Sequence, residues 1–114
     1  MSKSPAGDTS VVVTLCLGLA LTCASAAAQD PRFPAEQVQA GGGLFARHCA
    51  TCHGTRMRNP QWGIDLRTFP HDAHNRFIDS VANGKRNMPP WDDVLNPDEI
   101  EALWAYVAGG EAAN

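Results

Sequence analysis

The sequence predicts a small all-α domain with three main helices. Its C-terminal part carries the clearest signal, because Ile100, Leu103, Trp104 and Val107 recur at the spacing of one helix face. Helix start and stop residues flank this segment and an earlier one. No stretch alternates polar and apolar residues as a half-buried strand would. The chain is therefore expected to bury its apolar residues between helices, with loops connecting them.

The last helix is expected to begin at residue 97. Asn96 can cap it, Pro97 suits the first helical position, and Glu99 completes a box-like arrangement three residues after the cap. Gly109 and Gly110 are expected to end this helix.

Two earlier helices are expected. The first covers residue 35 or 36 to about residue 50, although its glycines at 41–43 cost about 1 kcal/mol each relative to alanine. Close packing against another helix would explain such small residues. The second runs from Asp72, as N-cap, to residue 83, where Gly84 can end it.

Residues 1–28 predict a signal peptide. Lys3 gives a positive start, residues 11–21 are nearly all apolar, and Ala26-Ala27-Ala28 fits a small-x-small cleavage site. The apolar run is too short to span a bilayer. Cleavage after Ala28 would leave residues 29–114, a single domain of 86 residues. A retained membrane anchor and a lipid-modified Cys23 are the alternatives.

Removal of the leader leaves Cys49 and Cys52 as the mature cysteines. Two cysteines cannot form a four-thiolate zinc site or a multi-disulfide scaffold. The mature chain has 8 basic and 11 acidic residues, a net charge of −3, which argues against nucleic-acid binding.

Cys49, Cys52 and His53 form a C-x-x-C-H pattern. Two thiols three positions apart lie on one side of a helical turn, so both can add to the vinyl groups of one haem. His53 is then held under the iron and can bind it through an imidazole nitrogen. The pattern is typical of covalent c-type haem attachment. A redox dithiol, a structural disulfide and half of a zinc site are the other interpretations.

Met88 is expected to bind the iron from the other side. It lies 35 residues after His53, and Pro89 and Pro90 stiffen the backbone behind it. A methionine presented from such a rigid loop suits a thioether ligand. The alternative role for Met88 is core packing.

Other side chains could compete for that position or support the site. His71 or His74 could replace Met88, whereas Met57 is only four residues past His53, too close to cross the haem plane. Metal-bound histidines donate their second N–H to an acceptor, which loop 59–66 is expected to supply, with Pro60 as one candidate. Three residues could hydrogen-bond the haem propionates or could equally be loop anchors: Trp62, Arg67 and Trp91. His48 is expected to point elsewhere.

With these residues identified, the chain resembles the class I c-type cytochromes from about residue 38 to 107. Gly41 and Phe45 lie eight and four residues before Cys49, where that family has a small residue and an aromatic residue in its first helix. Residues 103–106 match its Leu-x-x-Tyr, and Met88-Pro89 matches its distal loop. The family often has Gly-Pro-x-Leu after the haem site, and here Pro60 and Leu66 are six apart. The resemblance implies the small cytochrome c fold, its loops wrapped around one covalent haem and its terminal helices crossing.

These features predict an exported, periplasmic single-electron carrier rather than an enzyme. Cys49, Cys52, His53 and Met88 would bind haem c, and the last two would bind its iron. The expected partners are redox proteins: a dehydrogenase as donor, and a terminal oxidase or another cytochrome as acceptor. The distal loop and the last helix also resemble those of bacterial cytochromes that accompany quinoprotein dehydrogenases, which implies a donor of quinoprotein type. No nucleic acid and no stable membrane span after leader removal are expected. The rivals are a haem enzyme whose sixth site opens for peroxide or a gas, and a haem-free dithiol module.

Overall fold

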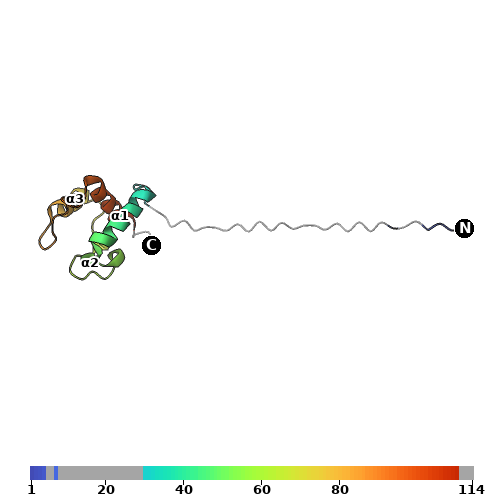
Figure 1. Ribbon diagram of the computed structural model, residues 1–114, viewed down its shortest axis with the longest axis horizontal. Coiled ribbons are helices and arrows are strands. Elements are labelled where there is room, and N and C mark those ends of the chain that lie inside the picture. Colours follow the sequence, from blue (N-terminus) through green and yellow to red (C-terminus); the bar gives the residue numbers. More distant parts are fainter. Residues whose placement is uncertain (5–6, 8–29, 111–114) are drawn as a thin grey trace.

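The computed structural model describes residues 1–4, 7 and 30–110, and Figure 1 shows helices connected by loops. The longer helices are α1 (Ala35–His48), α3 (His74–Asn83) and α4 (Pro97–Ala105), and the shorter turns are α2 (Ala50–His53), η1 (Thr55–Met57), η2 (Leu66–Thr68) and η3 (Tyr106–Gly110). Within these described residues the one β-type pairing is an isolated bridge, Lys85 to Met88. The all-α prediction is confirmed.

The predicted leader lies outside the described residues, except for residues 1–4 and 7. Across the part of the chain that the structure describes, no helix combines the length and the apolar character needed to cross a bilayer.

Helices α1 and α4 cross at Gly41 (Figure 1). A Cβ at this position would stand 1.9 Å from the carbonyl oxygen of Ala102 and 2.9 Å from the Cβ of Tyr106, so only glycine permits the approach. One turn further along, the rings of Phe45 and Tyr106 pack with their centroids 5.3 Å apart. The crossing of the terminal helices is confirmed, and so is the packing role expected of the glycines at Gly41 and Gly42, whereas a Cβ at Gly43 would meet only Arg47 of its own helix.

The start of α4 follows its sequence signals, whereas its end does not. The Glu99 N–H donates to Asn96 Oδ1 at 2.9 Å, and the Asn96 N–H donates to Glu99 Oε2 at 2.9 Å. The helix then widens into the π-helical turn η3, which includes Gly109 and Gly110. The α-helical part thus ends at Ala105, earlier than expected, and the helical turn η3 runs as far as Gly110. The ring of Phe33 packs over Gly109, where a Cβ would lie 2.5 Å from it.

Two other helix boundaries differ from prediction. Helix α1 ends at His48 rather than near residue 50, because the regular helix is interrupted at Cys49, where φ is −114°, and resumes as α2. Helix α3 begins at His74, and its N-cap position is Ala73 rather than Asp72. The Ala73 N–H donates to the Pro70 carbonyl at 3.1 Å, so a tight turn occupies the predicted cap. Gly84 ends α3 as expected.

The core lies where α1, α3 and α4 meet. Trp104 is at its centre, with the rings of Phe77 and Phe69 at centroid distances of 5.3 and 6.3 Å. On the outer side of Trp104, the ring of His74 packs edge-on at 5.5 Å, and its Nε2 lies 2.8 Å from Glu101 Oε2. This pair connects α3 to α4 at the surface.

The His74–Glu101 pair is expected to make stability depend on pH. The hydrogen bond to Glu101 raises the pKa of His74 above 6.5, so the pair stabilises the fold fully below that pH and is lost as pH rises through the folded pKa. Because both side chains are nearly half exposed, the effect should stay below about 1 kcal/mol. Urea unfolding at about pH 6 and about pH 8.5 should show it for the native chain and not for His74→Gln. Equal pH dependence in both proteins would contradict the prediction.

Candidate haem attachment site

Cys49, Cys52 and His53 lie together on the turn that follows α1. The N–H groups of Cys52 and His53 donate to the Cys49 carbonyl at 3.2 and 2.9 Å, which closes a helical turn. Both thiols are free, Cys52 exposed and Cys49 half-buried. The turn therefore presents two unbonded thiols and an imidazole from five consecutive residues.

The imidazole of His53 is oriented by a backbone carbonyl. Its Nδ1 lies 2.9 Å from the carbonyl oxygen of Ile64. A carbonyl can only accept, so Nδ1 carries the proton, and in the neutral ring the lone pair remains on Nε2. This is the arrangement that metal-binding histidines adopt, with one nitrogen fixed and the other available to the metal.

The loop that supplies this acceptor is held by a second carbonyl. The oxygen of Cys52 accepts from the N–H groups of Gln61, Trp62 and Gly63 at 3.0, 3.2 and 3.0 Å. Gly63 lies against the imidazole, where a Cβ would stand 2.5 Å from both Nδ1 and Cε1 of His53. The attachment turn and the loop thus hold each other in place.

Loop 59–66 was predicted to supply the acceptor, and this is confirmed, but Pro60 is not the residue that does so. Residues 63–66 read Gly-Ile-Asp-Leu, which fits the family pattern Gly-Pro-x-Leu in every position except the proline. The signal that could have located the acceptor was therefore the glycine–leucine spacing. The hydrogen bond needs a carbonyl rather than a pyrrolidine ring, and Ile64 provides it.

Replacing Gly63 with alanine is expected to displace the His53 ring, because the added methyl group would overlap it. Overpacking of this kind destabilises a protein by about 1–3 kcal/mol. The hydrogen bond to Ile64 should weaken, so the Nδ1 proton of His53 should exchange with solvent faster than in the native protein. NMR of the imidazole nitrogens measures this, and an unchanged exchange rate would contradict the contact.

The Cys49 thiol is not poised for attack. Burial raises its pKa to about 11, and the neighbouring Cys52 contributes to the rise. Redox-active dithiols depend on a cysteine whose pKa is lowered, since the thiolate is the nucleophile. In this respect Cys49 differs from the nucleophile of a thioredoxin-type dithiol, one of the interpretations left open by the sequence.

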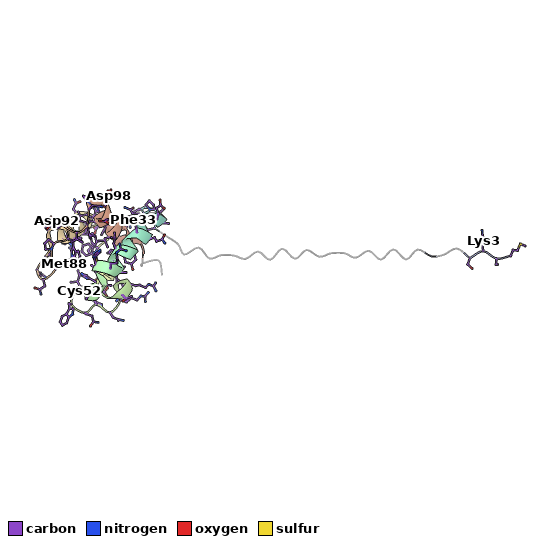
Figure 2. The ribbon with its side chains drawn as sticks, viewed as in Figure 1. Lys3, Phe33, Cys52, Met88, Asp92 and Asp98 are labelled. Carbon is purple, nitrogen blue, oxygen red and sulfur yellow. The ribbon has the colours of Figure 1, made fainter. Side chains whose placement is uncertain are left out.

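Met88 is placed by a tight turn after α3. The Lys85 N–H donates to the Met88 carbonyl and the Met88 N–H donates to the Lys85 carbonyl, both at 3.0 Å. Arg86, inside this turn, has a φ of 55°. The Met88 side chain is half-buried and packs against the core, as does Cys49. Figure 2 shows Met88 and Cys52 in a different part of the domain from Asp98 and Phe33.

The residues that could replace Met88 as a ligand have different environments in the structure. Both ring nitrogens of His74 are engaged, Nε2 by Glu101 and Nδ1 by Asn75 Oδ1 at 3.2 Å, which disfavours it as a ligand. Met57 is 1% exposed and belongs to the core. His71 is half-buried at the turn before α3. Met88 therefore stays the expected second ligand, with His71 as the alternative.

The residues suggested for propionate contacts have different exposures and contacts in the structure. Trp62 is 88% exposed, and Arg67 forms an ion pair with Asp65 at 2.7 Å. Trp91 packs its ring against the ring of His48, with centroids 5.3 Å apart. His48, expected to point elsewhere, thus faces the loop that carries Met88.

The donor set fits a covalently bound haem. Two free thiols on one turn can form two thioethers, and His53 has its Nδ1 fixed so that Nε2 can bind iron. Met88 could supply a thioether as the second axial ligand. Among the described residues no cluster of three or more His, Cys, Asp or Glu side chains could hold a metal ion.

Comparison with known proteins supports this assignment. Residues 36–107 match the model of the family described as "Cytochrome C oxidase, cbb3-type, subunit III". Cytochrome c6 of a Nostoc species is 34% identical over 82% of this chain and 86% of its own length. Cytochrome CL of the marine methylotroph Methylophaga aminisulfidivorans, a solved structure, superposes with a TM-score of 0.56 at 30% identity, covering 64% of this chain and 52% of that one.

A further relative is much longer. Quinohemoprotein alcohol dehydrogenase ADH IIB of Pseudomonas putida is 35% identical over 67% of this chain, and the matched part is 11% of that protein. The chain thus spans about a ninth of the dehydrogenase and about half of cytochrome CL.

Proposed function

Because this chain belongs to the class I c-type cytochromes, with covalently attached haem c as its cofactor, we propose that it is a periplasmic single-electron carrier whose haem is held by Cys49, Cys52, His53 and Met88. The observation that carries the proposal is the fixed imidazole of His53, which has Nδ1 bound to the Ile64 carbonyl and Nε2 available to iron. Thioethers from both cysteines would anchor the haem beside it.

Each residue has a defined task. When bound, the haem supplies a one-electron ferric–ferrous couple. His53 and Met88 would both bind the haem iron, so no substrate would have to bind it, and a histidine–methionine pair would raise the reduction potential. Gly63 and the Ile64 carbonyl keep the imidazole from rotating, so the site needs little rearrangement when an electron arrives or leaves.

The proposed route runs from a periplasmic quinoprotein-type dehydrogenase, through this protein, to a terminal oxidase. Its support is the naming of the relatives: one is a quinohemoprotein alcohol dehydrogenase, and the matching family model describes a subunit of a cbb3-type oxidase. Redox partners of this kind associate briefly through small interfaces. Rapid-mixing reduction by a purified quinoprotein alcohol dehydrogenase tests the donor, and a failure of electron transfer between the two proteins would exclude that class.

Spectroscopy of the protein, expressed with a haem-attachment system, tests the site. The pyridine haemochrome assay should give one covalent haem per chain, and the ferric protein should be low-spin with a methionine-to-iron charge-transfer band. A high-spin ferric protein without that band would overturn the carrier proposal in favour of a haem enzyme with an open sixth site. Absence of covalent haem would refute the attachment at Cys49 and Cys52.

A further inference from the structure

Trp91 connects three parts of the structure at once. It lies three residues past Met88, its N–H donates to the Val81 carbonyl near the end of α3 at 2.9 Å, and its ring packs against His48 at the end of α1. His48 adjoins Cys49, the first attachment cysteine. The two rings meet at a centroid distance of 5.3 Å and an interplanar angle of 59°.

From this geometry we propose that Trp91 is a positioning residue for Met88, and that it acts through its ring contact with His48. The inference rests on the proposed ligation of the iron by His53 and Met88. It adds a residue pair outside the four proposed haem-binding residues, and this pair determines how firmly the methionine stays in place.

The backbone around Met88 makes such an anchor necessary. The Lys85–Met88 turn fixes Met88 relative to its own loop, but not relative to the attachment turn. The next two residues, Pro89 and Pro90, have no N–H group to donate. The Trp91 N–H is therefore the first backbone donor after Met88, and it bonds to the end of α3.

The ring pair adds the missing connection to the haem side. His48 belongs to the helix that leads directly into Cys49, so the contact ties the Met88 loop to the turn that carries the thioethers. With this contact in place, the loop would hold the Met88 side chain near the haem at high effective concentration, so an outside ligand would compete with it poorly. Without it, the loop is held on one side only, and an outside ligand competes more successfully.

The test is the titration of the ferric holoprotein with imidazole, which displaces a methionine ligand, at one fixed pH. An aromatic contact of this kind corresponds to about a 2- to 10-fold change in an equilibrium. His48→Ala should therefore tighten the apparent imidazole affinity by about that factor, and His48→Phe, which keeps a ring, should restore the native value. Trp91→Ala should tighten it at least as much, and Trp91→Phe should fall between.

A matched control separates positioning from general loss of stability. Phe33→Ala also removes an aromatic ring that packs against the core, over Gly109, in a different part of the domain from Met88 (Figure 2). It should lower the resistance to urea and leave the imidazole affinity unchanged. His48→Ala keeps the tryptophan, so the test survives even if Trp91→Ala does not fold.

The outcomes distinguish this inference from the proposed function. A native protein without the methionine-to-iron band would refute Met88 as ligand, and the positioning role with it. If the native band is present but His48→Ala and Trp91→Ala bind imidazole as weakly as the native protein, only the positioning role fails. The same conclusion follows if Phe33→Ala tightens imidazole binding as much as they do.

Discussion

Replacing Met88 with alanine is expected to lower the reduction potential of the haem and to abolish the methionine-to-iron charge-transfer band. A thioether ligand favours ferrous over ferric iron relative to nitrogen or oxygen ligands, so its loss stabilises the oxidised state. The vacated axial position should also admit cyanide or imidazole without competition from the chain. Potentiometric titration of the holoprotein measures the first effect, and visible spectroscopy measures the others.

Met57→Leu is the matched control for this experiment. Met57 is 1% exposed and packs in the core, so its replacement by a residue of similar volume should cost less than about 1.5 kcal/mol and leave the potential unchanged. If Met88→Ala kept the native potential while Met57→Leu lowered it, the two methionines would have exchanged roles. An unchanged potential in both variants would point to His71 as the ligand.

Replacing Gly41 with alanine is expected to destabilise the fold severely, although it adds only one methyl group. The new Cβ would stand 1.9 Å from the backbone oxygen of Ala102, and neither helix backbone can move without separating α1 from α4. A cost of about 3 kcal/mol or more follows, a large part of the about 5–15 kcal/mol by which domains are stable. Urea unfolding of the holoprotein measures it.

Gly43→Ala provides the control on the same helix. A Cβ there would meet only the Arg47 guanidinium at 3.6 Å, an ordinary contact. Because alanine has the higher helix propensity, this variant should be more stable than the native protein by about 0.5–1 kcal/mol. Opposite signs at two glycines two positions apart would show that helix packing, rather than helix propensity, decides the outcome. A loss of stability at both would contradict this explanation.

The sequence predicted the features that depend on local chemistry. The capping box of α4 was readable because Asn96, Pro97 and Glu99 act within one turn. The attachment turn could be predicted because its two cysteines and His53 lie within five consecutive residues. The crossing of α1 and α4 followed from the family resemblance, which gave Gly41 a partner far away in sequence.

Features that depend on tertiary contacts were missed. The pairing of His48 with Trp91 joins residues 43 positions apart, and neither residue type indicates the other. The start of α3 was displaced by the Pro70–Ala73 turn, which competes with Asp72 as a cap. The contact of Gly109 with the ring of Phe33 was also missed, because it joins the two ends of the domain.

The hydrogen bonds of the Cys52 carbonyl affect how much the sequence of loop 59–66 can vary. This carbonyl accepts from three backbone N–H groups of residues 61–63, and the carbonyl of Ile64 orients His53. On the loop side, main-chain atoms make all four of these hydrogen bonds. The residue types at positions 61, 62 and 64 can therefore vary without loss of these bonds, as long as position 63 remains glycine. An isoleucine can therefore stand where related chains have proline. Searches that demand that proline would overlook proteins whose imidazole is held in the same way.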